Sequence, residues 1–290
     1  MLLEILTLAV IIVFTLLAFR KNAVMFLSIS FVLVYLIELY AYSTGNILSY
    51  FMEFACKSGV FDVGTFTAIY VHSLNPGHIF FNILIFFLVG YPFERRIGSF
   101  RFTSIFLVSG VVANIGYSSF LYFYHINSFI IGASGAIFGI MGAFLILYPN
   151  DEITMFLGPI LMPRVKVKYA VLAFMAVEFI ATLFWVNDNV AHGAHVIGAV
   201  TGAVFAYAIR NRISLRTVGS GTNSRKVDYA LFDKLADTDD LKRVCSRIRE
   251  EQDEIVRNSW ILEFFRKKYG DAQMDGKYVK AGGRRFKVFR

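Results

Sequence analysis

The longest uncharged stretch of this chain limits its fold more than any other feature. No Asp, Glu, Lys or Arg occurs from residue 102 to residue 150, a run of 49 residues. At about 1.5 Å per residue, one helix of that length would be more than twice as long as a bilayer core is thick, about 30 Å. The run must therefore fold back on itself, and the polar residues YHINS at 124–128 are the natural turn.

The same reasoning predicts seven membrane-spanning helices. The composition agrees, since 57% of the 290 residues are hydrophobic and only 17% are charged, which is typical of an integral membrane protein. The expected spans are residues 2–19, 23–43, 77–93, 102–123, 131–149, 168–187 and 190–209. The fold class expected from this pattern is an all-α, multi-pass membrane protein.

The basic residues of the loops predict how these helices are oriented. Lys and Arg gather in cytoplasmic loops, and every second loop here is basic, at residues 20–21, 95–101, 164–168 and 210–216. The N-terminus is therefore expected outside and the C-terminus in the cytoplasm. Because positive charges follow the first apolar run instead of preceding it, we interpret that run as a retained helix and not a signal peptide. The cell (cytoplasmic) membrane is the expected location.

The net charge is concentrated near the C-terminus. Residues 211–290 hold 19 Lys and Arg against 12 Asp and Glu, whereas the rest of the chain holds 10 against 9. Apolar residues at helical spacing and a turn at Gly282 and Gly283 predict a small basic α/β domain at 227–290, after a linker at 211–226. Contact with anionic lipid head groups, or plain solubility, is expected of this domain. Nucleic acid is not expected, because no recognition motif accompanies the charge.

Ser134 and His195 are the first candidates for chemistry. Ser134 lies in GASGAIFG (132–139) and His195 in GAHVIGAVTG (193–202). Small residues are typical of close helix packing in membranes, so the serine alone has a structural explanation. A histidine inside a membrane helix has few such explanations, because burying its polar nitrogens among apolar groups is costly.

Glycines predict that these two side chains meet. On the same helix faces lie Gly135, Gly139 and Gly142 after Ser134, and Gly198 and Gly202 after His195. Two such glycine stripes allow helix backbones to touch. Both side chains also lie about 22 to 26 Å above the cytoplasmic ends of their helices. The pair is therefore expected at one depth, below the outer surface.

His78 and Asn82 add two polar groups to the same layer. They are spaced i, i+4 and so project from one helix face. Donors at this depth can stabilise the oxyanion of a tetrahedral intermediate, together with the backbone N–H of Ser134. The alternative is that these groups only fasten helices together. Four polar residues at one depth favour catalysis.

These residues resemble the rhomboid family of intramembrane serine proteases. The resemblance consists of GASG at Ser134, H-x-x-G-x-x-x-G starting at His195, H-x-x-x-N starting at His78, and ERRIGS at 94–99. It extends over about residues 23–209. The match implies a serine-type endopeptidase that cleaves transmembrane segments of other membrane proteins.

The resemblance also implies a role for each site residue. Ser134 would be the nucleophile and His195 the general base, with His78 and Asn82 on the oxyanion side. Phe138 occupies the place of an aromatic residue that packs on the catalytic imidazole. The supporting glycines are Gly132, Gly135, Gly198 and Gly202. The resemblance implies a dyad, no carboxylate is expected beside it, and neither a metal nor a cofactor is expected.

The implied architecture is a six-helix core at 23–210, preceded by one extra transmembrane helix at 1–22. Two features depart from the family pattern. Residues 44–70 lack the usual Trp-Arg pair, and Glu178, in the middle of the sixth span, matches no family motif. His192 lies outside the histidine motif and has no assigned role.

Two alternatives to a protease use the same residues. One is a catalytically inactive relative, resembling the derlins, that binds membrane helices without cutting them. The other is a small transporter with a polar path across the membrane. The presence of both Ser134 and His195 disfavours the first, and polar residues gathered at one depth disfavour the second. The expected partners are transmembrane substrates and membrane lipids.

Overall fold

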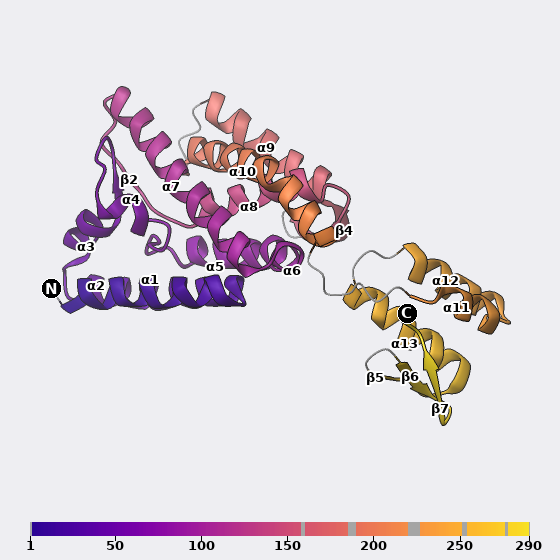
Figure 1. Ribbon diagram of the computed structural model, residues 1–290. Helices are drawn as coiled ribbons and strands as arrows, with labels where there is room; N and C mark the ends of the chain where they lie inside the picture. Colours follow the sequence, from indigo (N-terminus) through magenta and orange to yellow (C-terminus); the bar gives the residue numbers. More distant parts are fainter. Residues whose placement is uncertain are drawn as a thin grey trace. The chain divides into compact units, whose positions relative to one another are not determined.

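The helices of the chain follow its uncharged runs. The computed structural model describes residues 2–157, 160–184, 190–219, 227–250, 254–275 and 278–289. The chain divides into two compact units, Met1–Ser214 and Leu215–Arg290. The helices that begin in the first unit are α1 (Leu2–Arg20), α2 (Ala23–Ser43), α3 (Ile47–Phe54), α4 (Val63–Thr67), α5 (Pro76–Ile85), the π-helix η1 (Phe86–Gly90), α6 (Tyr91–Ile97), α7 (Ser99–Phe123), α8 (Ser134–Leu147), α9 (Val167–Leu183) and α10 (His192–Gly219) (Figure 1).

Five of the described helical segments are long and apolar enough to cross a membrane, judged by length and composition. They are Leu2–Arg20, Ala23–Ser43, Pro76–Ile97, Ser99–Phe123 and His192–Arg210. α1 packs along α2 and α7 (Figure 1). The predicted helical membrane fold is thereby confirmed.

Two of the seven expected spans are shorter than the sequence predicts. α8 has 14 residues and α9 has 17. α8 starts late because Gly132 has a φ of +115° and the residues before it are extended: β2 (Phe129–Ile130) pairs antiparallel with β1 (Cys56–Lys57). At about 21 Å, α8 is shorter than a bilayer core, so its first residue can lie below the outer surface. The end of the sixth expected span and the turn at 187–189 include residues outside the described ranges.

The basic loop expected between α8 and α9 contains a β-hairpin. β3 (Glu152–Leu157) pairs antiparallel with β4 (Ile160–Lys166), and the charged residues Glu152 and Lys166 lie opposite each other. At the base of the hairpin, the Arg96 guanidinium donates two hydrogen bonds to the Asp151 carboxylate, at 2.8 and 3.2 Å. This ion pair joins the end of α6 to the chain that follows α8.

A buried carboxylate joins α6 to the start of α2. Glu94 is 7% exposed and accepts the backbone N–H groups of Ala23 at 2.6 Å and Val24 at 2.9 Å. The Ser99 hydroxyl donates to the same side chain at 2.6 Å. The first N–H groups of a helix have no partner within it, and negative charge is favoured there. Glu94 therefore caps α2 from a distant part of the sequence.

The core of the helical unit is rich in phenylalanine. Phe31 of α2, Phe86 of η1 and Phe106 of α7 are fully buried, with ring centroids 5.1 to 6.2 Å apart. Phe93 of α6 stacks on Phe144 of α8 at 4.8 Å. Such ring contacts add to the stabilisation from burial alone. They connect α2, η1 and α7 with one another, and α6 with α8.

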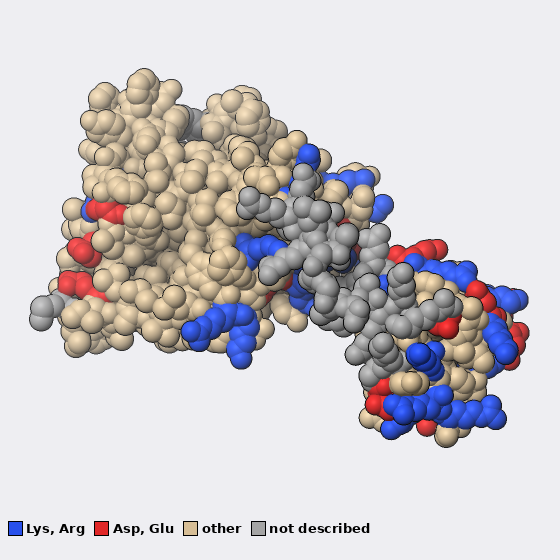
Figure 2. Space-filling model, viewed as in Figure 1, with Lys and Arg blue, Asp and Glu red and all other residues tan. Residues whose placement is uncertain are grey.

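The C-terminal unit is a small α/β structure, as predicted. Its elements are α11 (Tyr229–Leu235), α12 (Asp239–Glu250), α13 (Glu254–Tyr269), β5 (Gln273–Asp275), β6 (Tyr278–Ala281) and β7 (Arg284–Lys287). The strands form an antiparallel sheet in the order β5-β6-β7. Gly282 and Gly283 both have positive φ, which a tight hairpin turn requires. Charged residues cover the visible face of this unit, whereas the helical unit is mostly uncharged (Figure 2).

The segment between the two units was expected to be a linker at 211–226. α10 continues to Gly219, so the first part of this segment is helical. Residues 220–226 lie outside the described ranges. The domain boundaries expected at 22, 210 and 226 stay predictions.

Replacing Glu94 by Gln is expected to destabilise the helical unit. The amide is neutral, and its NH₂ group cannot accept a backbone N–H, so one donor at the start of α2 loses its buried partner. Loss of such a bond costs about 1 to 3 kcal/mol, which corresponds to roughly 2–4 °C in Tm for each kcal/mol. Thermal unfolding in detergent measures the change. Glu53→Gln, on the exposed side of α3, is the control and should leave Tm unchanged; equal Tm values for both variants would contradict the capping role.

Candidate active site

The glycine faces of α8 and α10 are in direct backbone contact. A side chain added at Gly198 would overlap the carbonyl oxygen of Gly135, and one added at Gly202 would overlap that of Gly139. A methyl group at either position would have to move a helix backbone, because no flexible side chain lies there to give way. The two helices are therefore as close as glycine allows, in agreement with the sequence pattern.

This contact brings Ser134 and His195 together. Nε2 of His195 lies 2.7 Å from Oγ of Ser134, a hydrogen-bond distance. The His195 side chain is only 7% exposed. The ring of Phe138 stacks on the imidazole, with centroids 4.5 Å apart and planes inclined by 11°. The imidazole is thus held against the serine from one side by an aromatic ring.

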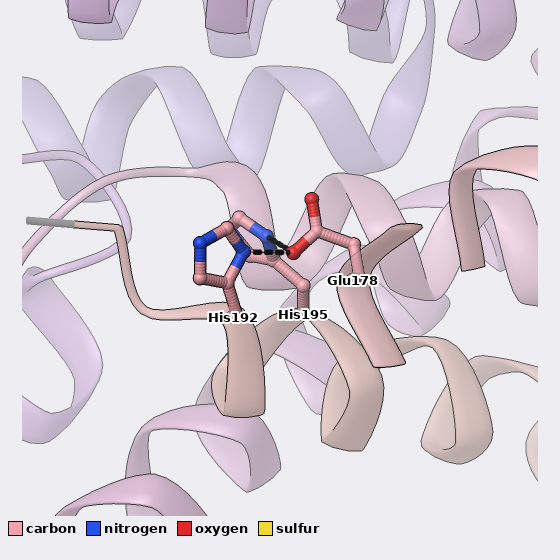
Figure 3. A group of neighbouring side chains, drawn as sticks. All are labelled: Glu178, His192 and His195. Atoms are coloured by element: carbon pink, nitrogen blue, oxygen red, sulfur yellow. Dashed lines mark hydrogen bonds and ion pairs between the residues drawn. The ribbon is translucent and has the colours of Figure 1, made fainter. Parts of the chain in front are cut away.

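A carboxylate lies on the other nitrogen of this imidazole. Oε2 of Glu178 is 2.8 Å from Nδ1 of His195 and 2.6 Å from Nδ1 of His192. Figure 3 shows both rings, from the first turn of α10, pointing at this one oxygen, which comes from α9. The expectation that no carboxylate stands beside the serine and histidine is therefore wrong.

Glu178 stood out in the sequence, but its role was missed because the residue was compared only with family motifs. Two signals in the sequence point to it. An acidic residue in the middle of an apolar span is costly unless it has a partner. His192 and His195 are spaced i, i+3 and so share one helix face. Together they indicate a carboxylate that serves two histidines.

The same three residues have the chemistry of a metal site. Their ligand atoms all lie within 4.8 Å of one another. Nitrogen and oxygen ligands of zinc at about 2.0–2.2 Å would be separated by about 3.3 Å in a tetrahedral site. The distances of 2.6 and 2.8 Å to Glu178 are shorter. They fit hydrogen bonds, and the three atoms would have to move apart to hold a metal ion together.

His78 faces the turn that precedes the serine. Its Nδ1 accepts the backbone N–H of Ser73 at 3.1 Å, so in the neutral ring Nε2 bears the proton. A side chain added at Gly132 would begin 2.7 Å from that Nε2 and 3.9 Å from Oγ of Ser134. The N–H of His78 is thus directed toward the turn from which Ser134 emerges.

Asn82 is turned toward its own helix. Its side-chain nitrogen donates to the carbonyl oxygen of His78 at 2.9 Å. This bond occupies one of the two N–H groups of the amide. Its expected part in stabilising an oxyanion stays a prediction.

Known protein families supply an independent comparison. A family model described as the Rhomboid domain matches residues 61–212, slightly more than half of the chain. The chain belongs to the rhomboid family. The match covers α4 to α9 and most of α10, and so includes every residue of the site described above.

Several curated relatives are named as rhomboid proteases. Rhomboid protease AarA of Providencia stuartii is 31% identical over 158 residues, which are 48% of this chain and 52% of the relative. Rhomboid protease GluP of Bacillus subtilis is 35% identical over 143 residues, 49% of this chain and 25% of the relative. Rhomboid protease GlpG of Salmonella paratyphi A is 26% identical over 143 residues, 49% and 46% of the two chains. The alignments span about half of these relatives or less.

Another buried acidic residue, which the sequence did not single out, lies in α2. Glu38 of α2 is fully buried, and its Oε1 accepts the backbone N–H of His72 at 3.0 Å. The His72 ring lies 5.3 Å from that of His78. Among the described residues, Oε2 of Glu38 and Nε2 of His72 have no hydrogen-bond partner. No contact links Glu38 directly to Ser134 or His195 in the described part of the chain.

An apolar cavity of about 680 Å³ lies beside α5, the helix that bears His78. Its walls include Phe80 and Phe81 of α5, Met155 of β3 and Phe174 of α9. Apolar and aromatic side chains supply almost the whole lining, and Thr154 is the polar exception. A cavity of this kind suits an apolar segment and not a charged solute.

Replacing Gly202 by Ala is expected to push α10 away from α8 and to separate His195 from Ser134. The longer distance between the imidazole and the hydroxyl should lower kcat at least tenfold, since displacements of about 1 Å in an active site lower the rate on the order of 100-fold. Cleavage of a reconstituted membrane substrate measures the change. Val200→Ile adds one methyl group on the exposed side of the same helix and should retain full activity. Equal activities of the two variants would contradict the backbone contact.

Proposed function

We propose that this rhomboid is an intramembrane serine endopeptidase that cleaves transmembrane segments of other membrane proteins. The main support is the distance of 2.7 Å between Oγ of Ser134 and Nε2 of His195 within an apolar helical unit. A serine hydroxyl is a weak nucleophile until a neighbouring base takes its proton. The imidazole is in position to do so.

The proposed reaction has two stages. His195 takes the proton of Ser134 as Oγ attacks the substrate carbonyl, and later gives it to the leaving amine. Water then hydrolyses the acyl-enzyme. Ser134 is the first residue of α8, and helix N-termini favour negative charge. The backbone N–H of Ser134 and the Nε2–H of His78 are therefore the proposed donors to the oxyanion.

The substrate must meet two physical conditions. An intact helix shields its carbonyl groups, so the segment to be cut has to unwind locally, and helix-breaking residues are expected near the cleavage site. Its apolar surface also has to find an apolar environment, which the cavity beside α5 provides. Both conditions fit a transmembrane segment better than a soluble peptide.

We also propose the orientation expected from the sequence, with the N-terminus outside and the C-terminal unit in the cytoplasm of a cell membrane. The pair of Arg96 and Asp151 supports it, because it joins the end of α6 to the chain that follows α8, where the basic loops gather. The C-terminal unit, with its excess of Lys and Arg, would then face anionic lipid head groups.

Ser134→Ala is expected to abolish both cleavage of a reconstituted membrane substrate and labelling by a fluorophosphonate probe, because no oxygen remains to attack. The expected loss in kcat is at least about 1,000-fold. Ser119→Ala, on the exposed side of α7, is the matched control and should leave both readouts unchanged.

Three outcomes separate the candidate functions. Labelling that survives the loss of Ser134 would refute its role as nucleophile. A parent protein that binds substrate and neither cuts it nor reacts with the probe would be an inactive binder of the derlin type. Substrate transport that persists in Ser134→Ala without any cleavage would indicate a transporter.

A further inference from the structure

We propose that Glu178 is a positioning residue: its carboxylate holds His195 in the tautomer and orientation in which Nε2 accepts the proton of Ser134. This inference rests on the proposed protease function and extends it from two residues to three. It also gives His192 a role, as a second donor that holds the carboxylate in place. None of these roles follows from the family motifs in the sequence.

The positions of the protons support this assignment. Oε2 of Glu178 lies within hydrogen-bond distance of Nδ1 in both His192 and His195. An ionised carboxylate oxygen can accept from both rings, and a protonated one can donate to one ring while it accepts from the other. We assign the first arrangement, a carboxylate with two Nδ1–H donors, because two N–H groups directed at one oxygen stabilise a negative charge there.

This arrangement fixes the tautomer of His195. A neutral imidazole has one N–H and one lone pair. With the proton on Nδ1, the lone pair of Nε2 faces Oγ of Ser134 at 2.7 Å. If Glu178 instead donated to Nδ1, Nε2 would bear the proton, and Ser134 would have no base. The carboxylate thus favours the tautomer of His195 in which Nε2 can accept the proton of Ser134.

Burial makes these hydrogen bonds effective. The side chains of Glu178, His192 and His195 are 12%, 11% and 7% exposed. Little water is available to replace a lost partner, and charges interact more strongly in such surroundings. His192 lies one turn before His195 on α10, and Glu178 is on α9. The bonds therefore connect two helices and leave the carboxylate little freedom to rotate away.

The carboxylate also acts during the reaction. The proton moves from Oγ of Ser134 to Nε2 of His195 as the bond from Oγ to the substrate carbon forms. His195 then bears a positive charge, with the Glu178 oxygen 2.8 Å from its Nδ1–H. The charge is stabilised until the proton passes from Nε2 to the leaving amine. Glu178 remains ionised throughout, so no proton is left over.

Glu178→Gln in the full-length protein tests this role. Glutamine has the same size but no charge, and its NH₂ group can face Nδ1 and favour the opposite tautomer. We expect kcat to fall roughly 100- to 10,000-fold, with KM changed less than about threefold. The rate of fluorophosphonate labelling should fall in parallel, which excludes an effect on substrate entry.

Recovery by a conservative variant separates positioning from a purely structural role. The groups that face His195 are Ser134 from α8, Glu178 from α9 and His192 from α10. A positioning role needs a charged oxygen beside Nδ1, so Glu178→Asp should recover part of the kcat that Glu178→Gln loses, with KM nearly unchanged. A helix-fastening role would lower activity only as far as Tm falls.

Two further variants complete the experiment. Thr182→Val removes a hydrogen bond to the backbone oxygen of Glu178 and leaves the carboxylate intact, so activity within about twofold of the parent is expected. Glu178→Asp keeps the charge with a shorter reach. It should have an intermediate kcat, and it replaces the Gln variant if that protein does not fold.

The possible outcomes distinguish this inference from the proposed function. If Ser134→Ala abolishes labelling while Glu178→Gln labels within threefold of the parent rate, the positioning role is wrong and the protease remains. Activity that falls in Glu178→Gln only as far as Tm falls, with no recovery in Glu178→Asp, would also overturn it. If Ser134→Ala still labels, the protease assignment itself fails.

Discussion

The contact between the backbones of α8 and α10 is the constraint on which the site depends. At Gly198 and Gly202, the carbonyl oxygens of the facing helix occupy the space that a side chain would need. In a membrane, apolar side chains gain little by leaving lipid for protein, so close helix pairs rely on small residues and van der Waals contact. The distance between the hydroxyl and the imidazole is therefore set by residues without side chains. A serine and a histidine on helices separated by ordinary side chains would not reach each other.

The late start of α8 puts Ser134 at the N-terminal end of that helix. Residues 129–133 form a short strand and a turn through Gly132, and the helix begins only at Ser134. The N-terminal end of α8, with its unpaired N–H groups and partial positive charge, thus lies inside the protein. A helix that began at residue 131, as expected, would have bonded the backbone N–H of Ser134 to the carbonyl of residue 130. The helix is therefore shorter than hydropathy predicts, and its late start leaves the backbone N–H of Ser134 free of a helical hydrogen bond.

Much of this structure follows from the sequence, and the exceptions have physical causes. The uncharged runs predicted the helices, and the glycines at 282 and 283 predicted a hairpin turn. Both features are local, because the length of an apolar run and the preference for positive φ depend only on neighbouring residues. The glycine stripes predicted that Ser134 and His195 approach each other. The hairpin of β3 and β4 was missed, since the segment was interpreted by its charges alone. The role of Glu178 was missed because the residue was compared only with family motifs, but its exact partner atoms could not be predicted, since they lie 14 and 17 residues further along the chain. Such pairing depends on how α9 and α10 rotate against each other, which residue spacing within one helix does not determine.

His78 and His195 both face the turn from which Ser134 emerges. Their protons are assigned to opposite ring nitrogens, because the two rings have different neighbours. Nδ1 of His78 accepts a backbone N–H from Ser73, so its Nε2 is a donor. Nδ1 of His195 meets the Glu178 oxygen, so in the proposed arrangement its Nε2 is an acceptor. A reaction that takes a proton from Ser134 and develops negative charge on a substrate oxygen needs one ring of each kind. The two neighbours differ in chemistry, a backbone amide and a carboxylate, and that difference is sufficient to give identical side chains opposite tasks.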